Sequence, residues 1–168
     1  MAFAPGACYS LFQPFGRLLA LNGTNAALRN IGWALLRIVS GILLMTHGYA
    51  KVSRAAADPN LQLGQFLETV RSLGFPMPEF FAWAAVVAEL GGGFLIAIGF
   101  LPPPAAALAA FTMAVAVFSH RDDPFAQQEK ALLFLVIFLV FLLGGAGPVS
   151  FDAWIQARRA RASASIFK

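Results

Sequence analysis

The chain has 168 residues and a formal net charge of +4, and its composition is 59% hydrophobic but only 12% charged. Soluble domains contain about 25% charged residues, so the composition excludes an ordinary water-soluble fold and indicates one compact membrane domain. The basic residues form no nucleic-acid-binding motif, and their excess is better explained as a signal of membrane orientation. Cys8 is the single cysteine, which leaves no disulfide and no thiolate metal site within the chain.

Residues 1–30 form an N-terminal extension in which aromatic residues occur among prolines and glycines. This pattern is not a clean signal peptide, and it predicts a segment that lies on the membrane surface. The first membrane span follows at about residues 32–50 and is apolar apart from Arg37 and His47. Because lipid offers no hydrogen bonds to the backbone, this span and the later ones are expected to be helices.

The loop after the first span, residues 52–79, predicts a short amphipathic helix that lies at the membrane interface. Asp58-Pro59-Asn60 is typical of a helix start, and Gly74-Phe75-Pro76 is typical of a helix end. Five apolar residues recur between these signals at helical spacing: Leu63, Phe66, Leu67, Val70 and Leu73.

Residues 80–119 contain one charged residue, Glu89. As a single helix this stretch would be ~60 Å long, twice the ~30 Å core of a bilayer, so it must turn. Pro102-Pro103-Pro104 is the expected turn, between spans at about residues 80–98 and 105–119. Glu89 then lies near the bilayer centre, where a carboxylate is costly and indicates a functional site.

A fourth span at about residues 131–148 precedes a basic tail, residues 151–168. Four spans place both termini on one side, and the arginine-rich ends favour the cytoplasm for that side. We therefore predict an all-α, integral membrane four-helix bundle over residues 31–150. Its expected location is a bacterial inner (plasma) membrane.

Several polar residues are expected to meet at the outer end of this bundle. His47 and Lys51 are four residues apart and share a helix face. His120 ends the third span, and Glu129 precedes the fourth. With Glu89 below them, these residues form a candidate ligand-binding site. The alternatives are that His120 and Glu129 are solvated loop residues and that Lys51 is a cation stabilising a helix end.

Arg37 and Glu89 are expected at similar depth and could form an intramembrane ion pair, unless Arg37 extends to the cytoplasmic surface instead. Gly91-Gly92-Gly93 and Gly99 are expected to let helices pack closely. Two histidines at one end also raise a haem or copper site. That alternative is less favoured, because His120 lies at a helix tip beside acidic residues, so no metal site is predicted.

The chain resembles the DoxX family of small four-helix membrane proteins over about residues 36–152. No single motif is specific, but their order along the helices is. The matching elements are Leu36-Arg37-Ile38, Gly41, His47-Gly48-x-x-Lys51, Gly74-Phe75-Pro76, Ala88-Glu89-Leu90-Gly91-Gly92, Gly99, His120, Glu129-Lys130-Ala131-Leu132-Leu133, Gly144 through Gly147 and Ser150-Phe151-Asp152, where the family typically has Ser-Leu-Asp.

The family takes its name from a subunit of a thiosulfate:quinone oxidoreductase. The resemblance implies a quinone-linked or otherwise redox-linked subunit without a covalently bound cofactor, with quinone as the candidate ligand at the outer cluster. Its expected partners are the lipid bilayer and proteins of a membrane complex or further copies of itself, not nucleic acid. A non-enzymatic anchor or assembly subunit is the alternative. A solute carrier is disfavoured, since no span is visibly broken.

Overall fold

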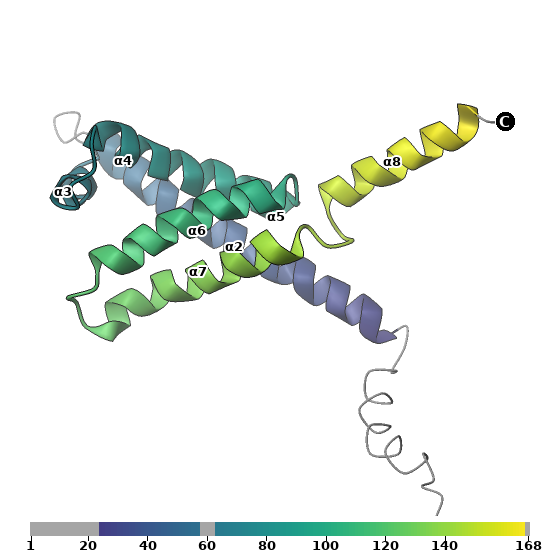
Figure 1. Cartoon of the computed structure of the whole chain (residues 1–168), viewed down its shortest axis with the longest axis horizontal. Helices are drawn as coiled ribbons and strands as arrows, with labels where there is room; N and C mark the ends of the chain where they lie inside the picture. Colours follow the sequence, from purple (N-terminus) through teal and green to yellow (C-terminus); the bar gives the residue numbers. More distant parts are fainter. Residues whose placement is uncertain (1–23, 58–62, 167–168) are drawn as a thin grey trace, which may run out of the picture.

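The computed structural model describes residues 24–57 and 63–166, and all regular structure in these ranges is helical (Figure 1). The predicted surface segment before residue 24 and the predicted helix start at Asp58-Pro59-Asn60 lie outside the described residues. The elements in chain order are α2 (Thr24–Ala57), α3 (Gln65–Ser72), α4 (Pro78–Val87), η2 (Ala88–Gly92), α5 (Gly93–Ile98), α6 (Pro102–Ser119), α7 (Phe125–Gly144) and α8 (Phe151–Ile166).

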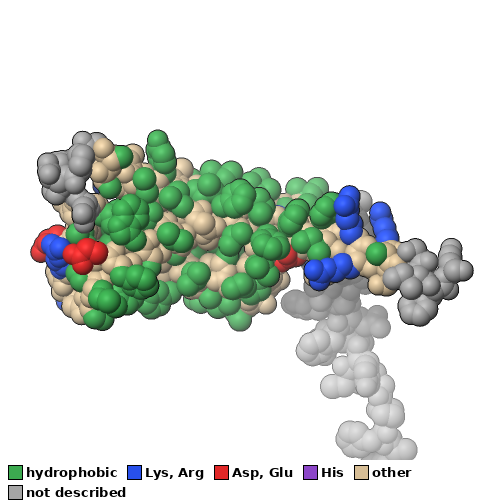
Figure 2. Space-filling view, turned by 90° about the horizontal axis from the view of Figure 1, so that it is seen from above, with side chains coloured by type: hydrophobic (Ala, Val, Ile, Leu, Met, Phe, Trp, Pro, Cys, Tyr) green, Lys and Arg blue, Asp and Glu red, His purple; other side chains and the backbone are tan. Residues whose placement is uncertain are grey.

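Four helical stretches in the described ranges are long and apolar enough to cross a membrane: Asn25–Ala56, Pro78–Ile98, Pro102–Ser119 and Phe125–Gly144. The predicted all-α, four-helix membrane fold is therefore confirmed. Figure 2 shows hydrophobic side chains over the middle of the molecule, with charged side chains towards its ends. The first helix is longer than predicted, since α2 continues to Ala57.

The prolines were expected to make the turn between the second and third spans, and this placement is wrong by a few residues. The turn lies at residues 99–101, where Gly99 has φ +72° and Leu101 has φ +47°. Pro102 is the first residue of α6. The first turn of a helix tolerates proline, because its backbone N–H groups have no partner within the helix. The prolines thus start α6 instead of interrupting it.

Small residues bring the helices of the bundle close together. Ala106 and Ala109 of α6 are fully buried in the central core beside Phe138 of α7. A Cβ added to Gly93 would lie 2.7 Å from the backbone oxygen of Gly41, so α5 and α2 touch through their backbones. The predicted role of the glycines in close packing therefore holds at Gly93.

The predicted helix after the first span is confirmed as α3, and it covers one end of the bundle. Its apolar side packs on α4, where Leu67 and Val70 form a small core with Val86. Arg71 donates a hydrogen bond to Glu79 Oε1 at 2.6 Å, and this bond raises the pKa of Arg71. The apolar residues that were expected to face the membrane interface are thus buried against the protein.

The second span contains one turn of π-helix, η2, between α4 and α5. π-helical turns are rare and occur frequently at functional sites. Glu89 is the second residue of this turn, and two of its five residues are glycines, which are poor helix formers. The irregularity in the span therefore coincides with its one charged residue.

The basic tail is helical as α8, which projects away from the bundle (Figure 1). Its first turns carry aromatic residues, with Phe151 and Trp154 stacked at 5.3 Å between ring centroids. The guanidinium of Arg158 lies 4.2 Å from the Trp154 ring. The side chains of Arg158, Arg159 and Arg161 are all exposed. They place a basic surface beyond the end of the bundle from which α8 projects.

Candidate functional site

The centre of the site is an ion pair between Lys51 of α2 and Glu89 of η2. The Lys51 Nζ lies 2.5 Å from Glu89 Oε1. The Glu89 side chain is 2% exposed and the Lys51 side chain 21%. Removing both charges from water is costly unless they neutralise each other, and this distance provides that neutralisation.

The predicted ion pair between Arg37 and Glu89 is therefore wrong. The prediction placed Lys51 beyond the end of the first span, but α2 continues for six residues after Lys51. Lys51 consequently lies within the helix, level with Glu89. Arg37 is fourteen residues earlier on the same helix, roughly 21 Å along its axis, and it belongs to the other end of the bundle.

Arg37 is 3% exposed and is held by backbone carbonyls instead of a carboxylate. Its guanidinium donates hydrogen bonds to the carbonyl oxygens of Ala146 and Val149, the second at 2.9 Å. A Cβ added to Gly99 would lie 2.7 Å from Arg37 Nη1, so the guanidinium also packs on the turn before α6. We call this end of the bundle the arginine end, and the end that carries α3 the pocket end.

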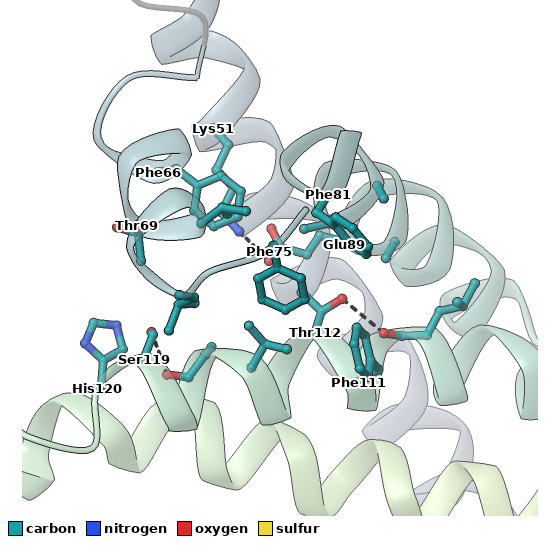
Figure 3. Close-up of a pocket in the computed structure, with 18 residues that line it drawn as sticks. Lys51, Phe66, Thr69, Phe75, Phe81, Glu89, Phe111, Thr112, Ser119 and His120 are labelled. Carbon is teal, nitrogen blue, oxygen red and sulfur yellow. Dashed lines mark hydrogen bonds and ion pairs between the residues drawn. The ribbon is translucent and has the colours of Figure 1, made fainter. Parts of the chain in front are cut away.

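A cavity of about 440 Å³ lies at the pocket end, under α3 and between α4 and α6 (Figure 3). Lys51 and Glu89 are its charged lining residues. Most of its wall is apolar, and four phenylalanines from three helices and one loop contribute to it: Phe66, Phe75, Phe81 and Phe111. The hydroxyl-bearing residues of the lining are Thr69, Thr112 and Ser119.

Some hydrogen-bonding groups of the cavity have partners within the protein, and others have none. Lys51 donates to Glu89 Oε1, and its Nζ lies 4.0 Å from the centroid of the Phe66 ring. An ammonium has three N–H donors, and Glu89 takes one of them, so donors remain for a ligand. Glu89 Oε2 is buried and has no hydrogen-bond partner in the described structure. The hydroxyls of Thr69 and Thr112 already donate to backbone carbonyls of their own helices.

The structure brings together three of the five residues predicted for the ligand site. His120 joins Lys51 and Glu89 in lining the cavity, and its Nδ1 lies 2.6 Å from Asp123 Oδ2. His47 and Glu129 are exposed and do not line it. The His47 ring instead packs edge-on against Phe134 of α7, with ring centroids 5.8 Å apart.

The two histidines thus have different surroundings: His120 lines the cavity and His47 does not. Within the described residues, no group of three His, Cys, Asp or Glu side chains is arranged to hold a metal ion. A pair of imidazoles on opposite sides of one haem would need both rings to face a shared space. The donors of this site suit an organic ligand with polar groups better than a metal.

The sequence-based prediction missed the aromatic wall of the cavity. Phe66 was recognised as part of an amphipathic helix, and Phe75 as part of a helix-ending motif. Neither signal showed that both rings face the same space as Phe111 of α6. The Gly91-Gly92 pair after Glu89 was the available sign of the π-helical turn, and it was interpreted as a packing surface.

Comparison with known families gives one match: the family model described as DoxX matches residues 32–122, more than half of the chain. This range includes Lys51, Glu89 and His120. No curated protein and no solved structure gives a significant match.

Proposed function

The chain belongs to the DoxX family of membrane proteins, and we propose that it is a quinone-linked subunit of a membrane oxidoreductase system that holds a quinone head group in the Lys51–Glu89 cavity. One observation carries this proposal: an ion pair with a buried carboxylate lies at an apolar, aromatic-lined cavity inside a membrane bundle. Stability alone is a weak reason for such a pair.

The residues of the cavity fit a quinone head group. Binding sites for small ligands are mostly apolar clefts of roughly 300–1,000 Å³ with a few polar groups that fix orientation, and this cavity has about 440 Å³. The rings of Phe66, Phe81 and Phe111 can pack against the ligand ring. A Lys51 N–H that Glu89 does not use can donate to a quinone carbonyl oxygen.

The side of the cavity suits entry from the membrane. Leu108 and Phe111 of α6 line it and are 59% and 58% exposed, on a surface that faces lipid in a membrane-embedded bundle. Helix α6 packs mainly on α7, η2 and α5 and has few contacts with α4, which leaves room between α4 and α6. A quinone with an isoprenoid tail can therefore insert its head group while the tail stays in the bilayer.

A bound quinone supplies reversible uptake of two electrons and two protons. The electrons come from a partner oxidoreductase, and the chain itself contributes binding and proton exchange. Lys51 orients one carbonyl and keeps the Glu89 carboxylate compensated. Glu89 can accept or return a proton at Oε2, and His120 at the mouth can pass protons between the cavity and water.

We propose an inner-membrane location with both termini in the cytoplasm, supported by the exposed arginines of α8 at the arginine end. A single cysteine introduced by Ser163→Cys, in a Cys8→Ser background, tests the orientation. We expect it to be protected from an impermeant thiol reagent in intact cells. Labelling from outside would overturn the proposed orientation.

Photoaffinity labelling tests the binding proposal. The full-length protein in bilayer nanodiscs is irradiated with an azido-benzoquinone, and the labelled peptides are mapped by mass spectrometry. We expect labelling of the segments that contain Phe66, Phe81 and Phe111, and its loss when unlabelled benzoquinone competes. Labelling spread along the lipid-facing side of α7 would contradict a specific site.

The second candidate function is a non-enzymatic anchor or assembly subunit. It is favoured by α8, which projects from the bundle with an exposed aromatic and basic surface. A stoichiometric complex that survives mild solubilisation, depends on α8 and is unaffected by Lys51→Met would support this function instead.

A further inference from the structure

Glu89 Oε2 is the most unusual atom of the cavity. Of the side-chain nitrogen and oxygen atoms described, two are buried without a hydrogen-bond partner: Glu89 Oε2 and Arg37 Nε. Arg37 lies at the arginine end and does not line the cavity, whereas Glu89 does. An unsatisfied buried acceptor is destabilising, and more so when it is charged. The unsatisfied acceptor therefore belongs to a side chain that lines the cavity.

The other polar groups of the cavity also accept more than they donate. Thr69 and Thr112 use their hydroxyl protons within their own helices, at 3.0 Å in each case, and Ser119 does so at 2.9 Å. These oxygens keep lone pairs but have no free proton. His120 Nδ1 is engaged with Asp123. The Lys51 ammonium still has N–H donors to offer, and it lies beside Glu89 Oε2, an acceptor that lacks a donor.

We propose that the cavity recognises a ligand hydroxyl group through Glu89 Oε2, and that it therefore holds a quinol more tightly than the corresponding quinone. This inference rests on the proposed function and specifies its ligand. In the bound state one quinol O–H donates to Glu89 Oε2, and the same oxygen accepts from Lys51 Nζ. A quinone offers two carbonyl acceptors, so it leaves Glu89 Oε2 unsatisfied and gains only the Lys51 contact.

The π-helical turn supports this assignment. Glu89 lies in the irregular turn η2, where it is 2% exposed, one oxygen bonds to Lys51 and the other remains without a donor. Turns of this kind occur frequently at functional sites. Gly48 of α2 packs closely on this turn, because a Cβ there would lie 2.8 Å from Leu90 Cγ and 3.1 Å from Glu89 Cβ.

Equilibrium binding to the full-length protein in nanodiscs tests the inference with three matched probes. These are a decyl-substituted benzoquinol, the corresponding benzoquinone and the dimethyl ether of the quinol, which keeps the reduced ring but has no hydroxyl. A hydrogen bond to a charged group is worth about 1.5–3 kcal/mol. We therefore expect the quinol to bind about 10-fold or more tightly than either other probe.

Glu89→Gln is the matched variant, because an amide of the same shape can donate to a carbonyl. We expect it to abolish the preference for the quinol, and Glu129→Gln, outside the cavity, to preserve it. Equal affinities of all three probes for the unmodified protein would overturn the hydroxyl inference while leaving quinone binding intact. Binding of none of them would overturn both the inference and the proposed function. The three-probe comparison decides the matter even if Glu89→Gln does not fold.

Discussion

Each end of the bundle holds one basic side chain of α2, and the two side chains have different partners. At the arginine end, the guanidinium of Arg37 donates to the carbonyls of Ala146 and Val149 and lies against a tight turn. At the pocket end, Lys51 bonds to the carboxylate of Glu89, a residue that lines the cavity and whose second oxygen is buried without a donor.

The difference separates a structural charge from a functional one. Arg37 bonds to backbone carbonyls of the loop between α7 and α8, and it does not line the cavity. The Lys51–Glu89 pair neutralises its charges but leaves N–H donors of Lys51 and the acceptor Glu89 Oε2 unused. Substitutions at the arginine end should therefore change stability, whereas those at the pocket end should change ligand affinity as well.

The largest effect is expected for Arg37→Ala. It leaves two carbonyl oxygens without their donors and opens a cavity at a buried position, so we expect the free energy of unfolding to fall by about 4 kcal/mol. Reversible unfolding of the detergent-solubilised protein by a denaturing surfactant measures this change. Arg37→Lys is the control and should lose less stability, because its ammonium can still donate to a carbonyl. It should still lose some, because an ammonium does not reproduce the planar guanidinium.

Because Arg37 and Glu89 do not pair, the destabilisation by Arg37→Ala and by Glu89→Gln should add within about 0.5 kcal/mol. Unfolding of the double variant checks this sum. A coupling energy clearly larger than that would reinstate a direct interaction between the two ends.

A somewhat smaller effect is expected for Lys51→Met, which leaves the Glu89 carboxylate buried and uncompensated at a cost of about 3 kcal/mol. Adding Glu89→Gln should recover part of this loss, since the unpaired charge is then removed. A double-mutant cycle measured by unfolding should give a coupling energy above about 1 kcal/mol. Independent effects would show that the pair at 2.5 Å contributes nothing to folding.

Gly93→Ala tests the close packing of α5 on α2, between the two ends of the bundle. The new Cβ would lie 2.7 Å from the Gly41 oxygen and 2.8 Å from Met45 Cγ, so α5 must move away from α2. We expect a loss of about 2 kcal/mol. Gly32→Ala is the matched control, since nothing lies within 4 Å of the added Cβ, and it should be neutral or slightly stabilising.

The smallest effects are expected for His47→Ala and Glu129→Gln, which alter exposed residues outside the cavity. Each should change stability by no more than about 0.5 kcal/mol and leave quinol affinity unchanged. His120→Ala, at the cavity mouth, should weaken binding modestly. If His47→Ala weakened binding as much as Lys51→Met, the ligand site would extend beyond the cavity.

Much of the fold followed from the sequence because hydropathy dictates it. The forty residues from 80 to 119 carry one charge, and bilayer thickness forces them into a hairpin. The position of the turn was missed because proline is compatible with a helix start. Leu101 has a positive φ, and a leucine in the sequence gives no indication of such a backbone conformation.

The candidate site was only partly predictable, for a reason that concerns α2. Sequence spacing shows that His47 and Lys51 share a face, but not how the helix is rotated in the bundle. Close packing sets that rotation, with Gly48 against η2. Lys51 lies about 60° from Gly48 around the helix and His47 about 100°. Lys51 therefore meets Glu89, while His47 turns to Phe134 of α7.

The most direct measurement of the central claim is the quinone and quinol content of the protein after mild solubilisation and purification, for the natural sequence, Lys51→Met and Glu129→Gln. We expect about one molecule per binding-competent chain in the natural protein and in Glu129→Gln, and a loss of about 10-fold in Lys51→Met at equal folded yield. Equal content in all three, or none in the natural protein, would contradict a quinone site at Lys51 and Glu89.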